Sequence, residues 1–173
     1  MRNSYYELID QTYDFPQNGF DLSENGLTFH NVDLNSLIEK YGTPFRLTYL
    51  PKISEKIGEA RRLFNQAIEE HNYNGKYEFC YCTKCCHFHH VIKKALKENV
   101  SLETSSSFDL DLIESFYKKG DLEKDIMIVH NGYKTDNYIK KIGRLMELGF
   151  TNSIPVLDSM NELEKLESLE TDQ

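Results

Sequence analysis

The stretch YEFCYCTKCCHFHHVIKKAL, residues 77–96, carries a strand pattern followed by a helix pattern. Residues 77–82 form a short apolar run typical of a β-strand, in which successive side chains point to opposite faces. The apolar residues that follow recur every three or four positions, the spacing of one face of an α-helix: Phe88, Val91, Ile92, Ala95 and Leu96. The stretch therefore predicts one strand and one helix.

The same order repeats along the chain. Strand-like runs occupy residues 45–50, 77–82, 100–104, 125–130 and 154–158, and a helical pattern follows each. The starts of these runs are separated by the length of one βα unit. This alternation predicts an α/β fold with parallel strands and crossover helices. Both an open doubly wound sheet and a (β/α)8 barrel fit it.

Local signals mark several helix ends. Ser106 stands three residues before Asp109, and Ser159 stands three residues before Glu162, as in capping boxes. Gly149 is placed to end the helix between them. After the first run, an apolar stripe predicts a longer helix: Ile53, Ile57, Ala60, Phe64, Ala67 and Ile68.

The first 44 residues differ in character from the rest. Residues 14–31, DFPQNGFDLSENGLTFHN, are polar and rich in turn formers, with a short strand predicted at residues 27–29. Asp33 is placed to cap a short helix that ends at Gly42. We therefore expect an N-terminal arm over residues 1–44 and a partial barrel over residues 45–173.

Length, composition and charge limit the classes of function that the chain can have. The 173 residues are enough for about one domain, and the formal net charge of −8 argues against nucleic acid as the main partner. No signal peptide is recognisable, and no apolar run reaches the roughly 18 residues of a membrane span. All four cysteines lie within one short stretch, unlike a secreted disulfide framework. We expect a cytoplasmic protein with reduced thiols and no membrane partner.

The stretch from Cys80 to His90 suggests three chemistries. A structural zinc site usually draws its ligands from two separated pairs, and no second cluster exists here, so zinc is not favoured. Cys82 and Cys85 form a C-x-x-C pair, but Lys84 lies inside it and the surroundings are not thioredoxin-like. The third interpretation centres on Lys84 itself.

Strand periodicity places Glu78, Cys80, Cys82 and Lys84 on one face. If that face is the interior of a barrel, the small cysteines fit the crowded space. Lys84 then reaches the mouth of the barrel at the carboxyl end of its strand, where barrel enzymes keep their chemistry. A partly desolvated lysine amine is nucleophilic and can form a Schiff base. The alternative is an ordinary solvated lysine, which suits nearly every other lysine of the chain.

Several stretches resemble one enzyme family. YCTKCCHFHHVIKKAL, YGTPFRLTYLPKI and ETSSSFDLDLIE are similar to the pyridoxal-phosphate decarboxylases of the alanine-racemase barrel type, and within them to biosynthetic arginine decarboxylases. LTFHNVDLNSLIEKYGTPF, HNGYKTDNYIKKI and GFTNSIPVLDSMNEL support this. The similarity is collinear and covers nearly the whole chain.

The resemblance implies a fold and an assembly. The chain would be the N-terminal five βα units of an incomplete (β/α)8 TIM-type barrel. The family's ring-stacking histidine, glycine-rich phosphate loop, pyridine-nitrogen acid and C-terminal β-domain would lie beyond residue 173. Since family enzymes build each active site from two subunits, we expect the full-length form to be a homo-oligomer, a dimer or higher, and this chain alone to be inactive.

The resemblance also implies site residues. Lys84 would form the covalent link to pyridoxal phosphate. Glu103 aligns with an acidic residue close to the cofactor, although a solvated strand end is the alternative. Asp109 aligns with another cofactor-proximal acid, but it could equally complement the dipole of its helix.

Two further residues would line the mouth by the same resemblance. His130 and Asn131 end the fourth strand, where a simple turn closed by Gly132 is an equally good interpretation. Relatives tend to carry serines after the lysine, where this chain has Cys85 and Cys86. Because both residue types are small, we expect the packing to be kept and only resistance to oxidation to change.

The implied reaction is decarboxylation of a small amino-acid substrate, arginine, to agmatine and carbon dioxide in polyamine and spermidine biosynthesis. Pyridoxal phosphate is the expected cofactor, and the resemblance also allows Mg²⁺. Diaminopimelate, ornithine or carboxynorspermidine decarboxylation are alternatives within this chemistry. A non-catalytic fragment with a Cys/His metal cluster is an alternative of another class. A nucleotide-binding module is disfavoured because no glycine-rich loop follows a strand.

Overall fold

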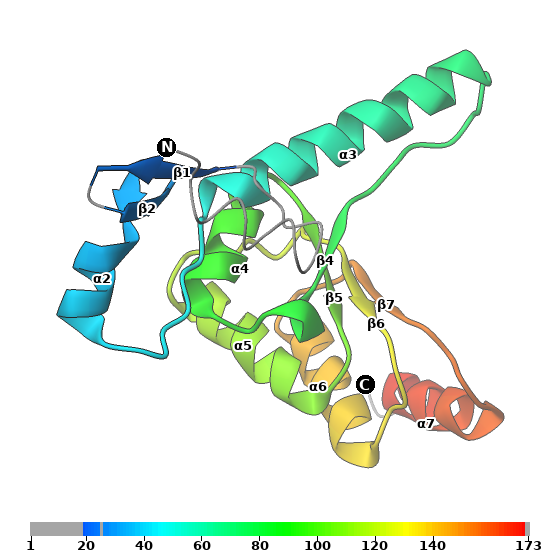
Figure 1. Ribbon diagram of the computed structural model, residues 1–173. Helices are drawn as coiled ribbons and strands as arrows, with labels where there is room; N and C mark the ends of the chain where they lie inside the picture. The colour runs from blue at the N-terminus through cyan, green and yellow to red at the C-terminus, as the bar shows by residue number, and fades with distance from the viewer. Residues whose placement is uncertain (1–18, 25, 172–173) are drawn as a thin grey trace. The chain divides into compact units, whose positions relative to one another are not determined.

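The computed structural model describes residues 19–24 and 26–171 (Figure 1). The chain divides into two compact units, Met1–Thr48 and Tyr49–Gln173. Within the described part, no helix is both long enough and apolar enough to cross a membrane.

The first unit contains a small antiparallel sheet and one helix. Its strands are β1 (Phe20–Ser23), β2 (Gly26–Phe29) and β3 (Val32–Asp33), in the order β1-β2-β3. Helix α2 (Leu34–Tyr41) follows, and the Asp33 carboxylate accepts a hydrogen bond from the Asn35 N–H at 2.9 Å. The strand predicted at residues 27–29 and the Asp33 cap are confirmed. Strand β1 was missed because its pattern of charged and turn-forming residues resembles a loop.

The second unit is built on a parallel sheet. Its strands are β4 (Cys80–Cys82), β5 (Ser101–Thr104), β6 (Ile128–His130) and β7 (Ser153–Pro155), in the order β4-β5-β6-β7. Cys82 pairs with Glu103, and Glu103 pairs in turn with Val129. The predicted parallel α/β architecture is thus confirmed for four consecutive strands.

The first predicted strand is absent from this sheet. Residues 45–50 belong to no ladder, and the sheet has four strands where five βα units were expected. The side chains of residues 45–48 are exposed. An apolar run reports a local preference, whereas a strand also needs a neighbour that pairs with its backbone groups.

Helices follow the strands in the predicted order. Helix α3 (Pro51–Glu70) precedes β4, and the 3₁₀ helix η1 (Thr83–Cys85) and α4 (His89–Leu96) follow it. Helix α5 (Ser107–Lys118) follows β5, α6 (Asp136–Glu147) follows β6, and α7 (Met160–Thr171) follows β7. Proline at the first position of α3 starts that helix without losing a hydrogen bond.

The main core lies between one face of the sheet and the helices. Leu102 and Ile128 come from the strands and are 1% and 0% exposed. The helix residues of this cluster include Ile92, Leu110, Ile113, Phe116, Ile142 and Leu145. In the predicted stripe of α3, Ile57 is buried while Phe64 is 52% exposed and stacks on Tyr77.

The predicted helix ends are largely confirmed. Asp109 Oδ2 accepts from the N–H of Ser106 at 3.0 Å, which is one half of the capping box. Gly149 lies just beyond α6 with φ +98°, a conformation suited to glycine. At α7 the Glu162 N–H donates to Ser159 Oγ at 3.3 Å, but the Glu162 carboxylate accepts from the Asp158 N–H instead of completing the box.

Candidate functional site

The carboxyl ends of three parallel strands gather the predicted residues at one edge of the sheet. Lys84 follows β4, Glu103 lies near the end of β5, and Asn131 follows β6. Parallel strands necessarily have their carboxyl ends at the same edge, which is where ligands bind in α/β sheets. Three residues from three separate strand ends therefore share this edge.

Lys84 lies in η1 and not in a strand. Strand β4 ends at Cys82, so the alternation predicted to aim Lys84 stops before reaching it. The Thr83 hydroxyl donates to the Glu103 carbonyl at 3.0 Å, and Thr83 is 1% exposed, so the turn is fastened to β5. The Lys84 side chain is exposed, and within residues 19–24 and 26–171 it forms no hydrogen bond or ion pair. Its amine is accordingly available to a ligand at this edge.

Glu103 and Asn131 are in direct contact. Asn131 Nδ2 donates to Glu103 Oε1 at 3.2 Å, and the Asn131 N–H donates to the Thr104 carbonyl at 2.8 Å. Asn131 Oδ1 accepts from the Gly132 N–H at 2.8 Å. Gly132 has φ +73°, and a Cβ there would lie 3.2 Å from the Ser105 carbonyl oxygen, so the turn requires glycine. The same turn that closes at Gly132 thus holds Asn131 against Glu103.

His130 is placed differently from the prediction. It was expected to line the mouth with Asn131, but its side chain is 0% exposed and lies on the face that packs against the helices. Thr104 Oγ1 lies 2.8 Å from His130 Nδ1 and 2.6 Å from the Tyr138 hydroxyl. Burial, with a smaller contribution from Lys134, lowers the pKa of His130 to about 4, so the ring is neutral at pH 7. Successive residues of a strand face opposite sides of the sheet. His130 therefore faces the core, while its neighbour Val129 faces the other side.

Asp109 serves the start of α5. Its Oδ2 accepts from the N–H groups of Ser105 at 2.8 Å and Ser106 at 3.0 Å. Its Oδ1 lies 3.3 Å from His87 Nε2 without forming a hydrogen bond in the described part of the chain. With the residue 1% exposed, its carboxylate stabilises the helix N-terminus, as the alternative interpretation expected.

All four cysteines are free. Cys80 and Cys82 lie on the sheet face opposite the main core, in register with Ser101 and Glu103. Burial raises the pKa of Cys82, and nearby Glu103 contributes to the shift. Among the residues that the structure describes, no three of His, Cys, Asp or Glu are grouped to hold a metal ion.

A buried ion pair supports the edge, and no sequence pattern predicted it. Lys134 and Glu162 are each 1% exposed, with Lys134 Nζ 3.7 Å from Glu162 Oε2. Lys134 Nζ donates to the Gly132 carbonyl at 2.9 Å and also to the Val156 carbonyl. Glu162 Oε1 accepts from the Lys134 N–H at 2.8 Å. The pair joins the loop after β6 to α7, and the bond from Lys134 to the Val156 carbonyl joins it to the loop after β7.

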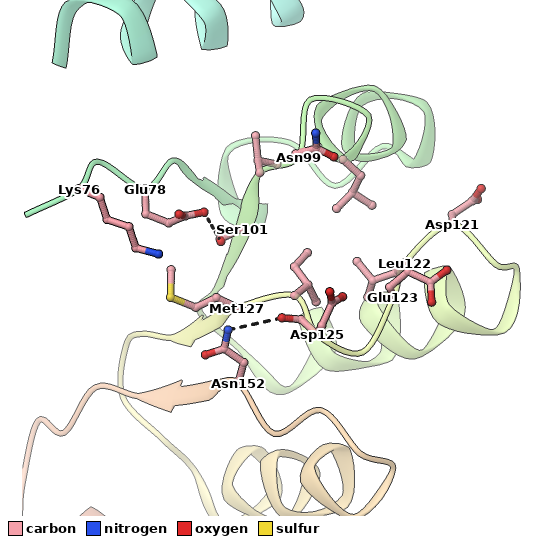
Figure 2. A pocket seen from close by; sticks show the side chains of 13 residues that line it. Lys76, Glu78, Asn99, Ser101, Asp121, Leu122, Glu123, Asp125, Met127 and Asn152 are labelled. Carbon is pink, nitrogen blue, oxygen red and sulfur yellow. Dashed lines mark hydrogen bonds between the residues drawn. The ribbon is translucent and has the colours of Figure 1, made fainter. Parts of the chain in front are cut away.

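A cavity of about 600 Å³ lies at the opposite, amino-terminal edge of the sheet (Figure 2). Its lining includes Glu78 just before β4, Ser101 at the start of β5 and Met127 just before β6. Glu78 Oε1 accepts from the Ser101 hydroxyl at 2.7 Å. None of the predicted site residues lines this cavity, so its size says nothing about the chemistry of Lys84.

The fold and the strand-end residues together define an α/β protein with a parallel sheet and an exposed lysine at its carboxyl edge. Comparison with solved structures supports that fold. A biosynthetic arginine decarboxylase from Campylobacter jejuni aligns with a TM-score of 0.69 over 90% of this chain and 27% of its own, at 20% identity. A protein from Aquifex aeolicus aligns with the same TM-score over 90% of this chain and 34% of its own.

Sequence comparison adds relatives with a named activity. Biosynthetic arginine decarboxylases from Geotalea uraniireducens and Geobacter sulfurreducens are 28% and 29% identical over 144 and 143 residues. Each alignment covers 78% of this chain and 22% of the relative, so the chain spans about a fifth of these relatives. No family model matches the chain. The resemblance to biosynthetic arginine decarboxylases is thereby confirmed.

Proposed function

We propose that this chain supplies the cofactor-linking part of a pyridoxal-phosphate-dependent decarboxylase that converts arginine to agmatine and carbon dioxide. The named relatives support the reaction class. The observation that carries the proposal is the position of Lys84, exposed and unpaired among the described residues, directly after β4. Full activity would also need parts of the arginine decarboxylases that lie outside their alignments with this chain.

The described residues fit one end of pyridoxal phosphate. Its aldehyde requires a free primary amine, which Lys84 offers. Glu103 and Asn131 sit on the neighbouring strand ends and would orient groups near that amine. When bound, pyridoxal phosphate supplies an electron sink for the pair left behind as the α-carboxylate departs. The glycine-rich loop and the ring-nitrogen acid implied by the resemblance are assigned to no residue of this chain.

The direct test of the lysine is reductive trapping. The protein, at the full length that its gene encodes, is incubated with pyridoxal phosphate, reduced with borohydride and mapped by mass spectrometry. We expect the label on Lys84, absent in Lys84→Ala and retained in Lys119→Ala, an exposed lysine at the end of α5. A label that stays on another lysine in the Lys84→Ala protein would refute the assignment.

The substrate is tested separately. Release of labelled carbon dioxide is compared for arginine, ornithine, diaminopimelate and carboxynorspermidine at equal concentration. We expect arginine to give the highest kcat/KM and agmatine as its product. A higher value for another of these substrates would keep the reaction class and change the substrate.

A further inference from the structure

Cys82 and Cys85 stand at the two ends of one 3₁₀ turn. Cys82 immediately precedes η1 and Cys85 is its last residue, three positions later. Cys82 is the last residue of β4 and has extended backbone angles, so the chain turns directly from the strand into the 3₁₀ turn. The Cα atoms at the ends of such a tight turn are less than about 7 Å apart, and disulfides bridge roughly 4.4–6.8 Å. The spacing of the backbone therefore suits a disulfide.

Strand pairing places Cys82 beside the candidate site, because its partner on β5 is Glu103. Burial raises the pKa of the Cys82 thiol, and Glu103 and Cys85 add to that shift. Cys82 is thus next to both the turn that carries Cys85 and a residue of the candidate site.

The two cysteines differ in access. Cys85 is exposed and Cys82 is partly buried, and both are free. An oxidant arriving from solvent meets Cys85 first, while Cys82 is positioned behind it. This is the arrangement of an attacking thiol with an adjacent resolving thiol.

We propose that Cys82 and Cys85 form a reversible disulfide that encloses Lys84, with a low-molecular-weight disulfide such as oxidised glutathione as the oxidant. The Cys85 thiolate attacks one sulfur of the oxidant, forming a mixed disulfide and releasing one thiol. Cys82 then attacks Cys85 Sγ and releases the second thiol. The protein loses two protons and two electrons, and the oxidant is reduced to two thiols.

The disulfide would alter the candidate site, an effect that rests on the proposed function. Oxidation removes the Cys82 S–H, which lies on the same face of the sheet as Glu103. It also closes a ring around Thr83 and Lys84, whose backbone is fastened to β5 through the Thr83 hydroxyl. The Lys84 amine would then be held in one altered orientation, so that pyridoxal phosphate links to it less readily.

Trypsin gives a specific readout because it cleaves after Lys84, between the two cysteines. The full-length protein is equilibrated in glutathione buffers of increasing oxidised fraction, the remaining thiols are alkylated, and the digest is analysed by mass spectrometry. We expect residues 77–84 and 85–93 to appear as one linked species that dithiothreitol separates. Fragmentation of this species should locate the bond at Cys82 and Cys85.

Four serine variants test the assignment. Cys82→Ser and Cys85→Ser should abolish the linked species, while Cys80→Ser and Cys86→Ser should retain it. A wild-type protein that stays fully reduced, a bond to Cys80 or Cys86, or a link that survives in Cys82→Ser would overturn the proposal. These outcomes do not depend on any enzymatic activity.

A second measurement links the disulfide to the lysine. Borohydride trapping of pyridoxal phosphate at Lys84 is repeated on oxidised and re-reduced protein. Trapping should fall in proportion to the oxidised fraction in wild type and stay constant in Cys85→Ser. If the disulfide forms but the reduced protein is never labelled, the function proposed for Lys84 fails and the disulfide stands. Equal trapping in both states would refute the effect on the lysine.

Discussion

The two faces of the parallel sheet serve different purposes. On one face Leu102, Ile128 and His130 are each no more than 1% exposed and pack toward the helices. On the other face, and at its carboxyl edge, Glu103 and Lys84 keep contact with solvent. Burial on the first face supplies most of the stabilisation, since it scales with the apolar area removed from water. The second face leaves Glu103 and Lys84 open to solvent, so substitutions on the two faces should act on different measurements.

The largest effect is expected from opening a cavity in the buried face. Ile128→Ala should lower the free energy of unfolding by about 4 kcal/mol, because a fully buried Ile loses its contacts and leaves a void. The matched control is Val129→Ala, one residue further on the same strand but on the other face, where about 1 kcal/mol or less is expected. Urea unfolding of the full-length protein measures both. Equal losses would mean that a partner covers the second face equally well.

A nearly comparable effect should come from pH. The pKa of His130 is about 4 in the fold and about 6.5 when unfolded. Above pH 6.5 both states are neutral and no penalty arises. As the pH falls from 6.5 toward 4, only the unfolded state binds the proton, and up to about 3 kcal/mol is lost.

The control for this pH effect is His130→Gln, which removes the titrating ring. Its stability should change less than that of the wild type between pH 7 and pH 4, even if it is lower at every pH. If both proteins lost the same stability between pH 7 and pH 4, His130 could not be the buried neutral group that causes the loss.

The buried Lys134–Glu162 pair lies at the carboxyl edge of the sheet, between the loop after β6 and α7. Lys134→Met should cost about 2 kcal/mol, which is below the usual loss for breaking a buried pair, because Glu162 keeps the backbone N–H donors of residues 134 and 158. It should also loosen the turn at Gly132, which hydrogen exchange at the Asn131 and Gly132 amides would detect. The exposed Lys140→Met is the control and should change neither quantity.

Sequence periodicity predicted those features of the fold that depend only on residues close together in the sequence. The alternation in residues 77–82 placed Cys80 and Cys82 on one face of their strand, and their register with Ser101 and Glu103 agrees. The serine and aspartate before α5 predicted its start for the same local reason. The run at residues 45–50 has a similar local pattern, but it joins no ladder. A local pattern could not predict this, because pairing depends on a second strand.

The candidate site was predictable only in outline. The position of Lys84 after β4 followed from the pattern, but the turn into η1 did not, because the Thr83 bond to the Glu103 carbonyl spans 20 residues. His130 was misplaced for a similar reason. Its partners Thr104 and Tyr138 are defined by the packing of α6 on the sheet, which no local spacing reports.

Glu103→Gln should have the smallest effect on stability and a much larger effect on activity. Glu103→Gln keeps the shape of the side chain and can still accept from Asn131 Nδ2, so the free energy of unfolding should change by about 0.5 kcal/mol or less. The carboxylate charge at this edge is lost, however, and kcat/KM for arginine should fall by up to about 100-fold if Glu103 orients the reacting groups. Asp111→Asn, an exposed carboxylate on α5 paired with Lys141, is the control and should leave kcat/KM unchanged. An unaltered kcat/KM in Glu103→Gln would assign Glu103 to the solvated strand end and remove it from the candidate site.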